Sequence, residues 1–74
     1  MKYVYLVYDE SHGLLHICGN RESADYDVKY IATHWYDLDT EHEPLDYDSE
    51  DCWGWEGIAY WQREEVKERD TITI

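Results

Sequence analysis

The chain has 74 residues, and its 18 Asp and Glu against six Lys and Arg give a formal net charge of −12. A chain this short forms one small domain, and its charge excludes a protein that grips nucleic acid or an anionic membrane through a basic face. Eight Tyr and four Trp exclude a disordered acidic chain, because such chains contain few aromatic residues. We therefore expect a single folded acidic domain over residues 1–74.

The sequence predicts a reduced, cytoplasmic protein. No apolar run approaches the roughly 20 residues of a membrane helix, and no signal-peptide cleavage site follows the first residues. Two cysteines, Cys18 and Cys52, are too few for a disulfide framework. We expect both of them to be free thiols.

Two strands open the predicted fold. In residues 2–8, every residue after Lys2 is aliphatic or aromatic, which is typical of a central strand covered on at least one face. Residues 9–13 form a turn cluster, and the apolar run 14–18 follows it. This order predicts an antiparallel hairpin.

A helix is predicted over about residues 21–34. Asn20 is a suitable N-cap, because its side-chain oxygen can accept from backbone amides one turn ahead. Spacings of four, three and four residues give one apolar stripe, formed by Ala24, Val28, Ile31 and Trp35. The opposite helix face carries Asp25, Lys29 and Thr33.

A long acidic loop is predicted at about residues 37–52. Eight of the fifteen residues from 37 to 51 are acidic, none is Lys or Arg, and Pro44 interrupts the run. Loops beyond about 12–15 residues are uncommon in compact domains and are usually functional or disordered. We name this segment the acidic loop and treat it as the first candidate for function.

A strand pattern resumes over residues 53–63, with Gly54 and Gly57 interpreted as a bulge or a close backbone approach. Alternation places four residues of this run on one face: Trp53, Trp55, Ala59 and Trp61. Residues 64–74 predict a short fourth strand or a frayed tail. The expected fold is α+β, a small antiparallel sheet of three to four strands with one helix packed on it, in the order β-β-α-β.

Carboxylates recur every second residue in both halves of the acidic loop. In an extended chain, alternate side chains lie about 6.6 to 7 Å apart on one side, similar to the phosphates along one nucleic-acid strand. Such a row can present the charge pattern of a DNA backbone to a DNA-binding protein. The alternative is a solvated loop that only keeps the protein soluble. The candidate partner-binding carboxylates are Asp37, Asp39, Glu41, Glu43, Asp46, Asp48, Glu50 and Asp51.

Aromatic residues near the acidic loop are candidate partner contacts, because Trp and Tyr at partly wet surfaces are typical of binding hot spots. These candidates are Trp35, Tyr36, Trp53 and Trp55. Three Trp on one strand face exceed what one short helix can cover. An alternative function is therefore a small adaptor that binds a partner through its Trp-rich strand face.

Metal and catalytic patterns are incomplete. Counted from Asp37 or Asp46, the sixth and twelfth positions lack the Gly and Glu of an EF-hand, which leaves only a weak divalent-cation module as an alternative. His16 and Cys18 are closely spaced, but no paired zinc spacing follows. The chain has no phosphate loop, nucleophile elbow or HExxH motif. We predict no cofactor, no metal, no catalytic residue and no enzymatic activity.

By class, the chain resembles the small acidic inhibitors encoded by bacteriophages, which include anti-CRISPR and anti-restriction proteins and the inhibitor of uracil-DNA glycosylase. The resemblance rests on size, charge, the acidic loop and aromatic content. It implies a stoichiometric DNA mimic that occupies the DNA- or RNA-binding groove of a host defence or DNA-processing enzyme. The implied partner is a basic nucleic-acid-binding host protein, with no direct contact to nucleic acid or membrane. A homodimer is left open.

Overall fold

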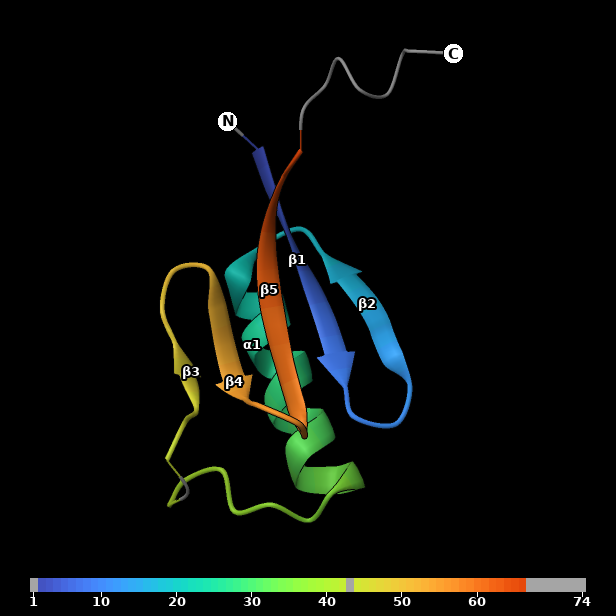
Figure 1. The fold of residues 1–74 in the computed structure, drawn as a ribbon, viewed down its shortest axis with the longest axis vertical. Coiled ribbons are helices and arrows are strands. Elements are labelled where there is room, and N and C mark those ends of the chain that lie inside the picture. Colours follow the sequence, from blue (N-terminus) through green and yellow to red (C-terminus); the bar gives the residue numbers. More distant parts are fainter. Residues whose placement is uncertain (1, 43, 67–74) are drawn as a thin grey trace.

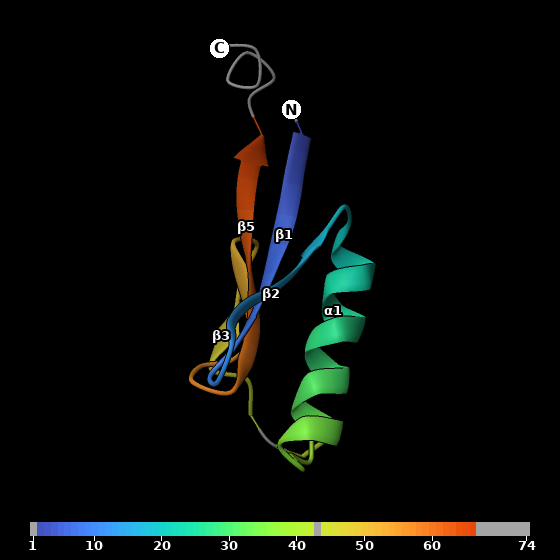
Figure 2. The same cartoon turned by 90° about the vertical axis from the view of Figure 1, so that its right-hand side faces the viewer.

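The computed structural model describes residues 2–42 and 44–66, which form one antiparallel sheet and one helix. The elements in chain order are β1 (Lys2–Asp9), β2 (Gly13–Cys18), α1 (Arg21–Tyr30), the π-helical turn η1 (Ile31–Trp35), β3 (Tyr47–Asp48), β4 (Cys52–Trp55) and β5 (Ala59–Val66). The strand order is β2-β1-β5-β4-β3, and α1 lies across one face of the sheet (Figure 1, Figure 2). The predicted α+β class is confirmed, but the predicted number of three to four strands is wrong, because the sheet has five.

The first half of the fold follows the sequence prediction. β1 and β2 form the expected antiparallel hairpin, with a register shift between Val7 and Tyr8. Asn20 caps α1 through a hydrogen bond that its Oδ1 accepts from the backbone N of Ser23, at 2.8 Å. This bond satisfies one of the amides that the first turn of a helix leaves without a partner.

The extra strands come from the second half of the chain. Residues 53–63 are not one bulged strand but the hairpin β4–β5, in which Trp55 pairs with Ala59 around a three-residue turn. Gly57 lies in that turn with φ +79°, a conformation that glycine adopts without strain. β3 is a two-residue strand inside the acidic loop and pairs with β4. The acidic loop is therefore partly built into the sheet.

The core lies between the sheet and the helix. It consists of Val7, Cys18, Ala24, Val28, Ile31, Ala32, Trp55, Ala59 and Trp61. Trp61 is completely buried, and its indole Nε1 donates to Asp25 Oδ1 of the helix at 2.7 Å. The helix covers two of the three clustered Trp side chains, and Trp53 remains half-buried beside them. The Trp-rich face is therefore mostly an internal surface.

The end of the helix departs from its predicted stripe at Trp35, which is 50% exposed. From Ile31 onward the chain forms a wider π-helical turn, which advances each residue by a smaller angle than an α-helix does. Ala32 becomes buried, and Trp35 rotates away from the sheet. Asp37 then adopts the left-handed conformation, with φ +54°, and the helix ends.

The second face of the sheet is not covered by any element that the structure describes (Figure 2). Of the described helices, none is long and apolar enough to cross a membrane.

Candidate partner-binding surface

Three ring side chains lie one turn apart on the outer side of the helix: Tyr26, Tyr30 and His34. Side chains at positions i and i+4 of a helix are neighbours, and these rings contact in sequence. The Tyr26 and Tyr30 rings are stacked with centroids 6.3 Å apart, and those of Tyr30 and His34 are 4.4 Å apart. Tyr26 is 68% exposed and Tyr30 46%. We call this set the ring ladder.

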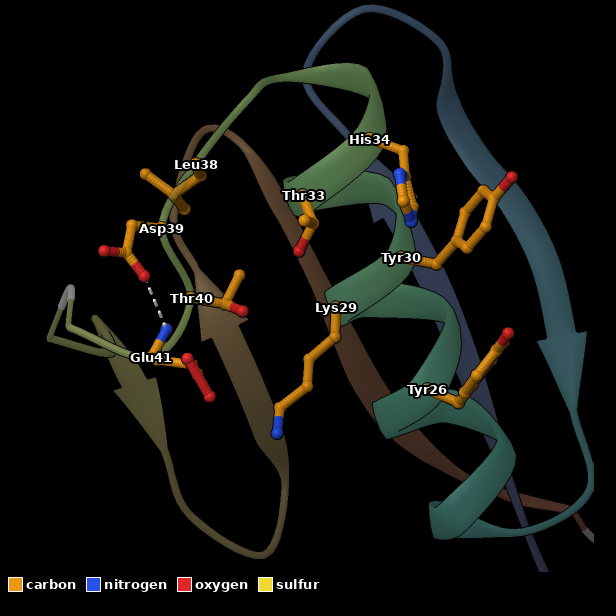
Figure 3. A pocket seen from close by; sticks show the side chains of 9 residues that line it. All are labelled: Tyr26, Lys29, Tyr30, Thr33, His34, Leu38, Asp39, Thr40 and Glu41. Carbon is orange, nitrogen blue, oxygen red and sulfur yellow. Dashed lines mark hydrogen bonds between the residues drawn. The ribbon is translucent and has the colours of Figure 1, made fainter.

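A groove of about 490 Å³ lies between the outer helix face and the first half of the acidic loop (Figure 3). Figure 3 shows Lys29 and Thr33 extending from the helix toward the loop, while the ring ladder follows the helix on their other side. The Lys29 ammonium lies 6.0 Å from the centroid of the Trp53 ring, within reach of a cation–π contact. The nine lining residues are Tyr26, Lys29, Tyr30, Thr33, His34, Leu38, Asp39, Thr40 and Glu41.

The loop side of the groove is a tight turn closed by Asp39. Its carboxylate accepts from the backbone N of Glu41 at 3.1 Å and lies 2.8 Å from His42 Nδ1. Residues 39–42 therefore do not form the extended row that the two-residue spacing suggests. The turn instead places the Asp39 and Glu41 side chains together at the groove, opposite the helix (Figure 3).

The second half of the acidic loop is fixed by its own carboxylates and by β3. Asp46 accepts from the backbone N of Glu56 at 3.0 Å, which ties the loop to the β4–β5 turn. Asp51 pairs with Arg63 of β5, with Nη2 and Oδ1 3.0 Å apart. Asp48 and Glu50 are exposed beside them. This half lies on the sheet side of the loop and does not line the groove.

Most of the loop charge is not neutralised. Within residues 2–42 and 44–66, arginine ion pairs join Arg21 to Asp25 at 3.6 Å and Arg63 to Asp51, so only one of them reaches the acidic loop. Asp39 has a histidine beside it, which is charged only when protonated. In the groove lining, the Lys29 ammonium offsets one of the two carboxylates, Asp39 and Glu41, so the groove keeps a net negative charge in a molecule of net charge −12.

The predicted aromatic contacts have three different environments. Trp35 is exposed, and its ring centroid lies 5.8 Å from that of His12. Trp53 is half-buried against Trp55, with centroids 5.8 Å apart. Trp55 is only 3% exposed and belongs to the core, so a partner cannot reach it in the folded protein. Among the predicted carboxylates, Glu43 lies outside the described residues.

Tyr36 is engaged in a buried polar network that sequence reasoning does not identify. Its hydroxyl donates to Asp9 Oδ2 at 3.0 Å. Asp9 is only 4% exposed and also accepts from the backbone N of His12 at 2.6 Å. Burial alone would raise the pKa of Asp9, but the hydrogen bonds from His12 and Tyr36 outweigh it, and the pKa lies below its ordinary value. The network joins the β1–β2 turn to the end of the helix.

The two thiols are free, as predicted from the cysteine count. Burial raises the pKa of the Cys18 thiol to about 11, and the hydrogen bond to Asp27 and its negative charge add to the shift. Cys18 is therefore a protonated core residue at neutral pH and not a nucleophile. Among the described residues, no three His, Cys, Asp or Glu side chains come together as a metal site.

The ring ladder is the part of this surface that the sequence analysis missed. Of the predicted outer face, Lys29 and Thr33 are exposed, whereas the prediction for Asp25 is wrong, because it is half-buried and accepts from Trp61; the rings share the exposed side of the helix. A signal was present, because Tyr26, Tyr30 and His34 follow one another at spacings of four. Outer helix faces are normally charged or polar, so exposed stacked rings at this spacing indicate a contact surface.

Comparisons with protein-family models, with curated proteins and with solved structures find no match to this chain. Function is therefore inferred from the residues and geometry of the surface itself.

Proposed function

We propose that this protein is a stoichiometric inhibitor that occupies the nucleic-acid-binding groove of a basic DNA- or RNA-binding protein. It acts by binding and carries out no chemistry. Carboxylates of the acidic loop take the place of phosphates, and exposed rings on the helix supply the apolar contacts. The resemblance to phage-type inhibitors favours a host defence or DNA-processing enzyme as the target, as in anti-CRISPR proteins, and the host cytoplasm as the compartment.

One observation carries the proposal. The groove has exposed, stacked rings on the helix side and the carboxylates of Asp39 and Glu41 on the loop side. Nucleic acids combine the same two features, π-faces that stack on aromatic or Arg side chains and a negative backbone that binds Lys and Arg. A site that accepts a nucleic-acid strand can accept this surface for the same physical reasons.

The charge balance supports a basic partner. Steering between opposite charges accelerates association, and in the groove the two carboxylates of Asp39 and Glu41 outnumber the single ammonium of Lys29. Since like charges within the chain repel and weaken a small fold, retention of a net charge of −12 favours a role in binding.

The alternative functions have weaker support. An adaptor that binds through the Trp-rich strand face needs that face to be accessible, but Trp55 and Trp61 are buried under the helix. A divalent-cation module needs a cluster of ligands, and the described residues contain none.

Paired charge variants test the groove. We predict that Asp39→Asn with Glu41→Gln weakens binding to the target about tenfold at low salt, because two phosphate-like charges are lost. The matched control is Glu10→Gln with Glu65→Gln, which removes the same charge from exposed positions in the β1–β2 turn and on β5, outside the groove. The control should change binding less than threefold. Target is first captured on the immobilised protein from the heparin-binding fraction of a bacterial lysate, and Kd is measured by titration calorimetry.

Ring variants complete the same test. Tyr26→Ala with Tyr30→Ala should weaken binding more than tenfold, as hot-spot aromatics do. Trp35→Ala is the control, because Trp35 is also an exposed ring, 50% exposed at the end of the helix, but does not line the groove. Equal losses from groove and control variants would mean that the groove is not the binding surface.

A further inference from the structure

The uncovered face of the sheet is largely apolar. Strand side chains alternate between faces, and the strand register assigns to this side the positions that do not face α1. Leu14 and Ile17 on this side are 49% and 64% exposed, and the others are half-buried. We call this side the open face; its apolar residues are Val4, Leu6, Tyr8, Leu14, Ile17, Tyr47, Cys52, Tyr60 and Val66.

Three tyrosines cross the middle of the open face. Tyr8 and Tyr60 are stacked with ring centroids 5.2 Å apart, and Tyr60 and Tyr47 meet edge to face at 5.3 Å. Gly54 lies between Tyr60 and Tyr47 in the register and has no side chain to separate them. The row therefore spans four strands, β1, β5, β4 and β3, as one continuous aromatic surface.

β1 has the composition of a strand that is buried on both sides. Antiparallel strands with one solvated face normally alternate apolar and polar residues, whereas strands covered on both faces are apolar throughout. From Tyr3 to Tyr8 no residue of β1 is charged, yet α1 covers only the side of Tyr5 and Val7. The sequence of β1 thus predicts a layer that covers the open face as well. The described residues of one chain do not supply such a layer.

Charge indicates what that layer is. Among the strand positions that point to the open face, only Lys2 and Glu64 carry a full charge, and their charges cancel, while Glu56 of the β4–β5 turn lies beside Tyr47 at the edge of the face. A basic partner finds little complementary charge on the open face. The acidic surfaces of a second copy would find no attraction there either. A second copy's own open face is apolar and carries its one unbalanced charge, Glu56, at the edge, so it can approach with the least repulsion that a chain of net charge −12 allows.

We propose that two copies of this chain associate through their open faces, giving a sandwich of two sheets about 10 Å apart with the helices outside. Since α1 lies on the far side of each sheet, both grooves stay accessible, on opposite sides of the dimer. Two linked copies engage a target with two nucleic-acid sites more tightly than one copy does. This association does not depend on the proposed inhibitor function.

Sedimentation equilibrium of the purified full chain tests the dimer. The expected result is a mass twice the monomer's 9.0 kDa at micromolar concentration in 0.5 M NaCl, with dissociation on dilution into low salt, because screening weakens repulsion between copies. Binding to the target is expected to weaken, in contrast, as the salt concentration rises. Monomer at every salt concentration up to 0.5 M and 100 µM protein would overturn the proposal.

Three variants locate the contact. Ile17→Glu places a charge on the open face at a side chain the fold leaves exposed, and it should shift the dimer Kd upward at least tenfold. Gln62→Glu, nearly isosteric and central on the same face, should do the same. Tyr26→Glu, equally exposed on the helix, should leave the dimer Kd unchanged. A dimer weakened by Ile17→Glu but not by Gln62→Glu pairs through the β2 edge instead, and that outcome also overturns the face-to-face arrangement.

Discussion

At the scale of single residues, Asp9 shows how an acidic chain uses a buried carboxylate. Burial of a carboxylate is costly unless hydrogen bonds compensate it. Asp9 accepts hydrogen bonds from the His12 backbone and from Tyr36, which lie in different parts of the chain, so its ionised form is stabilised only in the fold. In the free chain these bonds are lost. Asp9 thus links the protonation state of one group to the folding of the whole domain.

The lowered pKa of Asp9 predicts a pH dependence of stability. Because the folded pKa lies below the ordinary value of 3.8, the stabilisation is complete above that value and is lost as the pH falls through the folded pKa. Asp9→Asn should cost about 1–3 kcal/mol at pH 7, since a hydrogen-bonded buried charge is removed. The difference from wild type should shrink below about pH 4. Urea unfolding at pH 7, 5, 4 and 3 measures it.

Asp48→Asn is the control for this series, because Asp48 is exposed on β3. It should change the unfolding free energy by less than about 0.5 kcal/mol at neutral pH. An Asp9→Asn cost that stays constant or grows toward pH 3 would refute the role assigned to the Asp9 carboxylate.

At the scale of elements, the sequence was sufficient for the parts with a clear period. The hairpin of β1 and β2, the Asn20 cap and the buried stripe of Ala24, Val28 and Ile31 follow from local patterns. The sequence pattern does not reveal the turn between β4 and β5, because Trp55 and Ala59 are separated by an even number of positions. In–out alternation therefore continues across the turn, and a hairpin has the same pattern as a single strand.

Two other features had too little signal to predict. β3 contains only Tyr47 and Asp48, which is too short to show an alternating pattern in the sequence. It is a strand only because it pairs with β4. The exposure of Trp35 depends on the π-helical turn, which a regular helical spacing does not reveal. For the candidate site, composition identified the acidic loop, but only the fold brings residues 39–41 to the groove, opposite Lys29 and Thr33 and with the ring ladder beyond them (Figure 3).

Gly54 provides a prediction at the scale of the β4–β5 hairpin. Its φ is +136°, and a Cβ would lie 2.5 Å from the backbone O of Ala59 and 2.7 Å from Tyr60 Cα. Neither atom can move without shifting β5. Gly54→Ala should therefore destabilise the protein by about 2–4 kcal/mol, from strain and overpacking together. Gly13→Ala is the control, because Gly13 also has a positive φ, +75°, but has no atom within 4 Å of the added Cβ.

The control isolates the steric term. Gly13→Ala should cost about 1–2 kcal/mol, from backbone conformation alone. Equal losses for the two variants in thermal and urea unfolding would show that β4 does not approach β5 as closely as the structure indicates.

At the scale of the whole molecule, charge and apolar surface are separated. The sheet has an apolar open face with little charge, whereas the groove, the ring ladder and the first half of the acidic loop lie around the helix side and the end of the domain (Figure 2, Figure 3). Salt is expected to act oppositely on the two surfaces. It screens attraction to a basic target and also screens repulsion between copies. One protein can therefore self-associate and bind a basic partner through different faces.

The central claim is that this protein and nucleic acid compete for one site on the target. The most direct test is fluorescence anisotropy of a labelled duplex DNA or single-stranded RNA bound to the captured target, titrated with this protein. The account predicts complete displacement, saturating at one chain per nucleic-acid site, with an apparent affinity that falls as salt rises from 50 to 300 mM. A stable ternary complex of target, nucleic acid and this protein, with the nucleic-acid Kd unchanged, would contradict it.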